Sequence, residues 1–425
     1  MDSASNLAIA PGVPEKVFTF LVLLLSSGAF QNLTFNPGDT PDATSGQAGM
    51  QIVWIVVYVI SVILLVRTCK GAITNSLREY PLMALAVLAI ASTTWSDNPS
   101  VSLRRGVALA LTCLFGVYFA SRFTLREQMR LLGWVCGVSV LVSYPFGVLG
   151  LGTPSEEFAS AWYGIFVHKN DLGRMMVLSI AVFLLLAKSE PRKKPMLWSG
   201  AFLALVLLFL SQSATSVVAL AVVLAAFPFC RSLNGNKSKV ATVMIVTTVT
   251  IGAALYWLIS NLQSVMELLG KDITLTGRLP LWILSGVMAL RKPWFGYGYN
   301  AFWLGPGSAS DKIWAIVGWK PPHAHNGLLE LWLELGLLGV VTFLVGFFMY
   351  SIRAIRLLQR SSEPEMIWPF LFLVLMAITN LTEVTILSRN NLFWIVYTAV
   401  VISVSPHYQR AEDITLLALP EGHLA

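Results

Sequence analysis

The chain has 425 residues, of which 56% are hydrophobic and only 12% are charged. Soluble globular proteins carry about 25% charged residues, so the composition excludes a soluble fold and predicts one domain of packed membrane helices over residues 1–425. The net charge of +7 does not indicate nucleic-acid binding, because most basic residues lie in short loops between apolar runs.

Apolar runs long enough to cross a bilayer recur along the whole chain. A crossing helix needs about 20 apolar residues. The runs predict an all-α polytopic membrane protein with about 12 transmembrane helices. Their ranges are 16–35, 50–67, 79–96, 104–121, 130–150, 171–188, 195–212, 213–230, 239–260, 328–351, 367–383 and 390–406. Lys and Arg concentrate in alternate loops, which predicts that both termini face the cytosol.

One long outer loop, residues 261–325, joins the ninth and tenth predicted spans and is too long to be a bare connection. Apolar residues at helical spacing predict a short amphipathic helix in it, lying on the membrane or on the bundle. These residues are Leu279, Trp282, Ile283, Val287 and Leu290. The Gly- and aromatic-rich stretch 292–303 follows, and it fits either a sugar-binding platform or an interfacial aromatic belt.

The segment PPHAHNG ends this loop, and Asn326 is expected to cap a helix that begins at Gly327 or Leu328. His325 then lies just outside the helix, where a neutral imidazole could accept a proton from a sugar hydroxyl. The alternative is an interfacial His bonded to a backbone carbonyl, which spacing alone favours. His323 is expected to point elsewhere.

A second candidate site is the entry to the sixth span, WYGIFVHKNDLGRMM. His168, Lys169 and Arg174 crowd this span end, and Asn170 or Asp171 is expected to cap the helix. Arg174 lies one turn inside, where it faces either a neighbouring helix or a ligand phosphate.

Further charged residues recur at span ends on the same predicted side as the long loop. They are Arg104 and Arg105 in WSDNPSVSLRRG, Arg278 at the start of the amphipathic helix, and Glu383 and Arg389 in TNLTEVTILSRNN. Singly, such basic residues fit anchoring to lipid headgroups; converging from separate loops, they would form an anion-binding pocket.

Several kinds of chemistry have no motif in the chain. HExxH, paired CxxC, G-x-S-x-G and Walker A sequences are absent, as is an outer Asp-x-Asp. We therefore expect no metal and no cofactor, and any pyrophosphate would have to be neutralised by Arg and Lys. The predicted spans carry almost no charge at mid-depth, which argues against an ion-coupled transporter.

Four of these stretches together resemble the O-antigen ligase/polymerase superfamily of bacterial envelopes. They are WSDNPSVSLRR, WYGIFVHKNDLGRMM, the pattern GR–LW–P–FGYGYNAF over 277–302, and HAHNGLLELWLELGLLG, the most specific of the four. Their order, spacing and topology agree with the superfamily over most of the chain. The H-K-N-x-x-G form at 168–173 looks most like exopolysaccharide polymerases of the ExoQ and Wzy type.

The resemblance implies a metal-independent, inverting glycosyltransferase of the membrane-embedded GT-C kind in the bacterial inner membrane. Its donor would be a glycan on undecaprenyl pyrophosphate, and its active site would face the periplasm. By the same resemblance, His325 is the base or acceptor-orienting residue. Arg278 and Arg174 would hold the pyrophosphate, with Arg104, Arg105 or Lys169 in support. Asn326, His323, His168, Asn170, Glu330, Glu383 and Arg389 are supporting candidates, and Glu330 or Glu383 is the next candidate base.

The resemblance leaves the acceptor open. A polymerase would pass the glycan to another lipid-linked repeat unit, with a chain-length regulator and a flippase as possible partners. A ligase would pass it to lipid A–core. A flippase for lipid-linked oligosaccharides would also be polytopic and lined by basic residues, but it would not need the HAHN loop. A non-catalytic scaffold would tolerate loss of His325.

Overall fold

The structure, a computed structural model, describes residues 11–31, 47–68, 71–151, 161–233, 278–360 and 363–406, and within these ranges it is entirely helical. This confirms the predicted all-α class. The α-helices are α1 Val13–Ser26, α2 Gln47–Thr68, α3 Ala72–Ser76, α4 Tyr80–Ala91, α5 Pro99–Arg122, α6 Leu125–Val148, α7 Lys169–Ser189, α8 Lys194–Leu210, α9 Ala214–Leu233, α12 Arg278–Arg291, α13 Asp311–Val317, α14 Gly327–Arg360, α15 Trp368–Thr379 and α16 Leu392–Ser403. Short 3₁₀ turns lie at η2 Ser92–Thr94, η4 Pro191–Lys193 and η5 Pro364–Ile367.

Among the described residues, six helical stretches are long and apolar enough to cross a membrane. They are Gly49–Arg67, Pro99–Arg122, Leu125–Val148, Lys169–Ser189, Pro191–Leu210 and Gly327–Arg360. Shorter apolar helices at Tyr80–Thr94, Ala214–Cys230, Pro364–Thr379 and Leu392–Ser403 coincide with four further predicted spans. The predicted span 239–260 lies outside the described residues, so the count of twelve stays a prediction.

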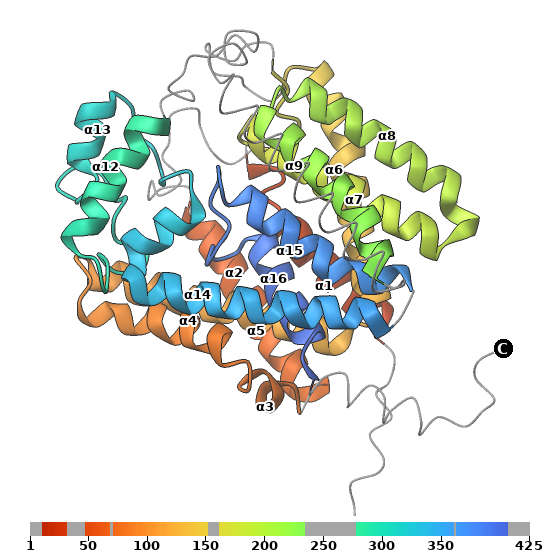
Figure 1. Ribbon diagram of the computed structural model, residues 1–425, viewed down its shortest axis with the longest axis horizontal. Helices are drawn as coiled ribbons and strands as arrows, with labels where there is room; N and C mark the ends of the chain where they lie inside the picture. The colour runs from red at the N-terminus through yellow and green to blue at the C-terminus, as the bar shows by residue number, and fades with distance from the viewer. Residues whose placement is uncertain are drawn as a thin grey trace, which may run out of the picture.

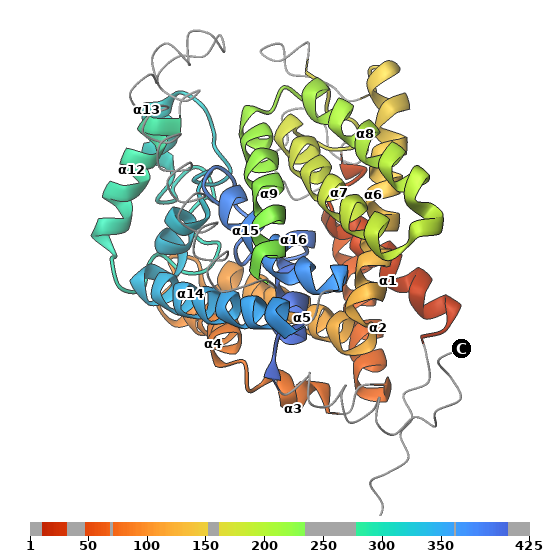
Figure 2. The same ribbon diagram turned by 45° about the vertical axis from the view of Figure 1, so that its right-hand side comes forward.

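The centre of the bundle is built from helices that are apolar on every side, as expected for helices with no exposed face. All twelve residues of α16 are buried, and α16 packs against α5. Helix α7 packs against α6, α8 and α9, and most of its residues are buried. In both views α15 and α16 lie between the group α6–α8 and the pair α12–α13 (Figures 1 and 2).

Helix α14 is interrupted at Gly336, whose backbone has φ 68° and ψ −170°. The interruption frees backbone groups that a membrane cannot solvate, so they need protein partners. The segment 293–298 supplies them: Leu337 N–H donates to the Pro293 carbonyl (2.8 Å), and the Leu333 carbonyl accepts from Tyr297 N–H (2.8 Å). A side chain at position 336 would meet the Trp294 carbonyl at 2.2 Å, which explains the glycine.

The described part of the long loop forms α12, which packs against α14, and α13, which packs against α12 (Figure 1). Helix α12 coincides with the predicted helix of this loop, but it does not have one polar and one apolar face. Its two faces are both largely apolar: Leu281 and Met288 are buried against the bundle, whereas Ile283 and Leu290 are 59% and 65% exposed. Residues 261–277 of the predicted loop lie outside the described ranges.

Ion pairs gather at the end of the bundle opposite to α12 and α13. They join Arg122 to Glu15, Arg126 to Glu365, Arg130 to Glu190 and Arg353 to Glu79. The other end carries the loops with His325 and Glu383, and the ion pair between Arg278 and Glu383 lies there.

We expect the end with α12 and α13 to face the periplasm, because the predicted flanking loops 231–239 and 353–362 are basic. The exposed residue Lys312 of α13 is a suitable probe. A Lys312→Cys variant in a Cys69→Ser background should react with an impermeant maleimide in intact spheroplasts. The three other native thiols, Cys113, Cys136 and Cys230, are buried.

The matched control is Arg192→Cys, at an exposed residue of η4 on the end held by ion pairs. It should react only after lysis. Labelling of Arg192→Cys but not Lys312→Cys in intact spheroplasts would invert the topology.

Candidate active site

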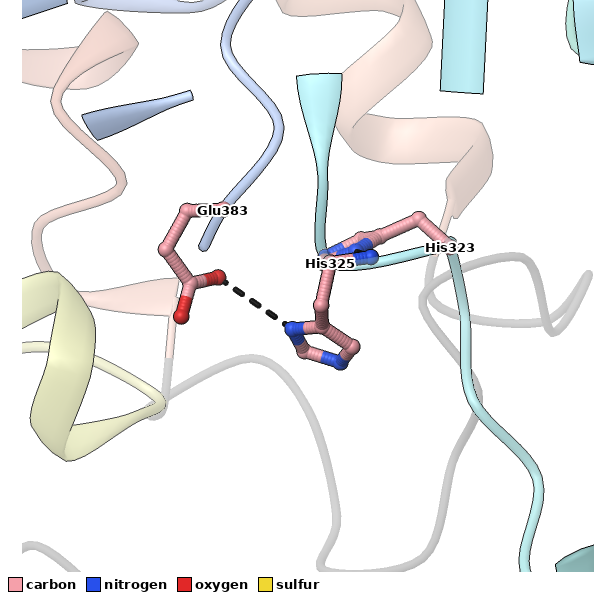
Figure 3. A group of neighbouring side chains, drawn as sticks. All are labelled: His323, His325 and Glu383. Carbon is pink, nitrogen blue, oxygen red and sulfur yellow. Dashed lines mark hydrogen bonds and ion pairs between the residues drawn. The ribbon is translucent and has the colours of Figure 1, made fainter. Parts of the chain in front are cut away.

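The carboxylate of Glu383 is the meeting point of the candidate site. Glu383 lies in the loop between α15 and α16 and is only 8% exposed. Its Oε1 accepts from Arg278 Nη2 and from Asn170 Nδ2, both at 2.8 Å. Its Oε2 lies 3.4 Å from Nδ1 of His325 (Figure 3). Four loops or helix ends that are far apart in the sequence thus converge on one carboxylate.

The surroundings of Glu383 keep it ionised. Burial by itself raises the pKa of the Glu383 carboxyl, but the hydrogen bond from His325 and the charges of His325, Arg278 and His323 outweigh burial. The pKa of Glu383 is therefore held far below its ordinary value of 4.5. An ionised carboxylate at this position can orient His325 and fix Arg278, so Glu383 is better suited to this supporting role than to that of a base.

The turn that carries His325 is held from both sides. The Ala324 N–H donates to Glu330 Oε2 (2.7 Å), and the Ala324 carbonyl accepts from the Trp282 indole (2.9 Å). The His325 N–H donates to Nδ1 of His323 (3.1 Å), and the two imidazole rings lie 4.2 Å apart. The prediction that His323 points elsewhere is wrong, because this turn folds the two rings together (Figure 3).

His325 has the geometry of an oriented imidazole. Its φ is 50°, a left-handed conformation that this tight turn requires. With Glu383 as acceptor, the proton of the neutral ring resides on Nδ1, and Nε2 keeps a lone pair. The His325 side chain is 15% exposed.

The start of α14 follows the sequence prediction. Asn326 Oδ1 accepts from Leu329 N–H (3.0 Å), and the helix begins at Gly327, so the predicted cap is confirmed. Gly327 N–H donates to the Asn380 carbonyl (2.8 Å), and a side chain at 327 would meet Asn380 Oδ1 at 2.2 Å. This close approach brings the loop with Glu383 beside His325.

The entry to α7 differs from the prediction. His168, rather than Asn170 or Asp171, is the N-cap, and its Nδ1 accepts from Asn170 N–H (3.2 Å). Burial is the main cause that lowers the pKa of His168, although the charges of Asp171 and Glu383 oppose it. The Asn170 side chain is left to bridge Glu383 and Ser213, whose hydroxyl donates to Asn170 Oδ1 (3.0 Å).

Arg174 lies one turn into α7, where its Nη2 donates to Asp171 Oδ1 (2.7 Å) and its guanidinium covers the Phe393 ring at 5.1 Å. It lines a pocket between α7, α9 and α15 together with Asn170 and Glu383. One turn deeper along α7 the lining is Val177. The α15 wall of the same pocket includes Leu375 and Ile378. The pocket is therefore polar at the site and apolar toward the bundle interior.

The other predicted basic residues have different surroundings. Arg105 is 7% exposed, and its Nη1 donates to the Asn300 carbonyl (2.9 Å), so it supports the loop at 300. Arg104 is exposed on α5. Lys169 is buried at the first position of α7, and Arg389 follows the loop of Glu383 at a half-buried position.

The aromatic stretch 292–303 is exposed only in its first part, where Trp294 and Phe295 are 66% and 53% exposed. Tyr297, Tyr299, Phe302 and Trp303 are each 8% exposed or less, because they pack into the core or under α14. Sequence reasoning also missed Glu334, whose Oε1 accepts from the backbone and side-chain N–H groups of Asn300, at 3.2 and 2.6 Å. Its position four residues after Glu330 on a span was the available signal.

The sequence showed no metal-ligand motif, yet one group of potential ligands forms in the described part of the fold. Ligand atoms of His323, His325 and Glu383 lie within 4.8 Å of one another. Two of the three already have partners: Nδ1 of His323 accepts the His325 N–H, and Glu383 pairs with the Arg278 guanidinium. A guanidinium on the carboxylate disfavours a second cation there.

The sequence is similar to that of known proteins over part or most of its length. Residues 199–344, which include Arg278 and His325, match the family described as O-antigen ligase. The predicted superfamily resemblance is confirmed. The chain is 28% identical over 357 residues to the exopolysaccharide production protein ExoQ of Rhizobium meliloti, covering 78% of this chain and 79% of that protein. It is 25% identical over 270 residues to a candidate polysaccharide ligase of Rickettsia conorii, covering 56% of this chain and 64% of that protein.

The chain is thus similar to proteins of the O-antigen ligase and exopolysaccharide-production kind, and its described part holds six helices able to cross a membrane. The matched family segment does not include Asn170 or Glu383. The structure, however, brings both of them onto the same cluster as Arg278 and His325.

The His323 environment predicts a pH effect on stability. Burial, reinforced by the charge of His325, lowers the pKa of His323 well below 6.5. The unfolded chain therefore binds more protons than the folded one as the pH falls through about 6.5, and stability is lost there. A His323→Asn variant keeps an acceptor for the His325 N–H but does not titrate.

In detergent, the melting temperature of the wild type should fall relative to His323→Asn by about one to a few degrees between pH 7.5 and pH 5. Because His168 titrates in both proteins, the difference between them isolates His323. Parallel pH curves for the two proteins would contradict the assignment.

Proposed function

We propose that this chain moves a glycan from undecaprenyl pyrophosphate onto an acceptor sugar at the periplasmic face of the inner membrane. The reaction is inverting and independent of metal, and its main product is polymerised exopolysaccharide or O-antigen repeat units. The observation that carries the proposal is the pair His325–Glu383 beside Arg278, with Glu383 also lining a pocket that it shares with Arg174.

On the donor side, Arg278 and Arg174 hold the pyrophosphate. Arg278 donates to Glu383, and Arg174 donates to Asp171. Because a guanidinium has five N–H donors, further donors are available for phosphate oxygens. The prenyl chain leaves this polar end along Val177 and Ile378. Lys169, Arg104 and Arg105 remain supporting candidates, with Arg105 acting through the loop at Asn300.

On the acceptor side, Nε2 of His325 takes the proton of the attacking hydroxyl. The acceptor oxygen bonds to the anomeric carbon as the bond from that carbon to the pyrophosphate oxygen breaks. The leaving group departs from the opposite face, so the anomeric configuration inverts. Glu383 stabilises the imidazolium that forms, and Arg278 matches the charge that develops on the pyrophosphate.

Polymerisation is preferred because the similarity to ExoQ covers most of the chain. The family description as O-antigen ligase favours a second candidate, transfer to lipid A–core. A polymerase would operate with a flippase that supplies the repeat unit and with a regulator of chain length. Reconstitution with lipid-linked repeat units, with and without lipid A–core, separates the two: a ladder on the lipid means polymerase, and product only on the core means ligase. No product under either condition, with lipid-linked units moved across the bilayer, would favour a flippase.

The base assignment predicts a large effect of His325→Asn, a substitution that tolerates the positive φ of this residue. Turnover should fall by about 100-fold or more, while binding of the lipid-linked donor changes little. The matched control is His168→Asn, which keeps a helix-capping oxygen and should retain turnover within a few-fold. Normal turnover in well-folded His325→Asn protein would remove the base assignment.

If arginine side chains rather than a metal ion neutralise the pyrophosphate, saturating EDTA should leave turnover unchanged. Arg278→Ala should abolish measurable transfer, and Arg278→Lys should restore it only in part, because lysine keeps the charge but loses the bidentate fork. Inhibition by EDTA that magnesium reverses would instead assign a metal to the group formed by His323, His325 and Glu383.

A further inference from the structure

Tryptophans are frequent in the outer segment, and most of them have a structural role. The indole N–H groups of Trp282, Trp303, Trp314 and Trp332 donate to Ala324 O, Glu330 Oε2, Pro321 O and Pro293 O at 2.9 to 3.1 Å. Among the described residues, no such partner is seen for Trp319 or Trp294, which are 38% and 66% exposed. These two indoles are therefore free to contact something outside the fold.

Only one of the two exposed indoles adjoins the candidate site. Trp319 follows Gly318, whose left-handed backbone (φ 78°) ends α13 and turns the chain toward the His325 loop. The Trp319 and His325 rings lie 5.9 Å apart and are tilted by 43°. Trp294 is held by its backbone at the α14 break near Gly336, about 14 Å along the helix from Gly327.

The His325 ring has different neighbours at Nδ1 and next to Trp319. Nδ1 faces Glu383, which also holds Arg278, so the donor pyrophosphate is expected on that side. The ring of Trp319 borders His325 from the loop that precedes it. A pyranose has an apolar C–H face and a rim of hydroxyl groups, and a broad exposed aromatic ring binds the face while leaving the rim accessible.

We propose that Trp319 is the platform on which the acceptor sugar stacks, so that its hydroxyl is presented to Nε2 of His325. This inference rests on the proposed transfer reaction and names the acceptor subsite of the same site. It applies equally to a polymerase and to a ligase, because the acceptor is a sugar in both. The competing role for an exposed Trp is anchoring in the membrane interface, and leucine would preserve much of that role.

The test compares Trp319→Leu, Trp319→Phe and the matched control Trp294→Leu, each as the full chain in lipid nanodiscs. The binding probe is the repeat-unit oligosaccharide released by mild acid from the lipid-linked units used in the transfer assay. Its dissociation constant is measured by calorimetry, and the acceptor KM and kcat are measured separately at saturating donor.

We expect Trp319→Leu to raise both the dissociation constant and the acceptor KM about tenfold, with kcat changed by less than about threefold. Trp319→Phe should lose only two- to threefold, since a smaller aromatic face remains. Trp294→Leu should match the wild type. Equal binding by Trp319→Leu and wild type overturns the platform, as does equal loss in Trp319→Leu and Trp294→Leu, or a wild type that does not bind the oligosaccharide.

The two proposals can fail separately. If the wild type binds the oligosaccharide in a Trp319-dependent way but transfers nothing, the proposed reaction fails and the sugar platform stands. If transfer occurs with unchanged acceptor constants in Trp319→Leu, the reaction stands and the platform fails.

Discussion

A buried carboxylate needs matched partners, and this requirement organises the outer end of the bundle. Glu383 is 8% exposed, and an unpaired charge at such a position would cost several kcal/mol. Arg278, Asn170 and His325 satisfy it from three separate segments. The same contacts that stabilise the carboxylate therefore align a proton acceptor with a cation, so assembly of the fold and assembly of the site are one event.

The break in α14 at Gly336 helps to position the loops around Glu383. Backbone groups freed at Gly336 must find protein partners, and the segment 293–298 provides them. Glu334 and Arg105 then hold the following turn through Asn300, while Glu330 holds the turn at Ala324. Charged residues within the first turns of α14 thus serve as anchors for the loops that carry the chemistry.

His325 lies between two environments with different chemistry. Toward α7 and α15 the surroundings are charged, and Asn170, Arg174 and Glu383 line a small pocket there. Toward the end of α13 the neighbour is an exposed indole, which suits a sugar. A transferase that joins a lipid-linked glycan to a sugar hydroxyl needs both a site for the lipid phosphate and a site for the sugar beside one base, and orientation at such a point provides much of the catalysis.

The sequence by itself determined the features that depend on local patterns. Apolar run length predicted the membrane helices, helical spacing predicted α12, and the Asn–Gly pair predicted the start of α14 at Gly327. It also singled out His325, Arg278 and Glu383, but as separate candidates. Only the tertiary structure decided that they meet, because the partners of Glu383 lie 58, 105 and 213 residues away, and helix packing alone sets which span ends are neighbours. The same packing buried the aromatic stretch around Tyr299 and left Trp319 exposed beside His325, since a residue's burial depends on which elements cover it rather than on its own side chain.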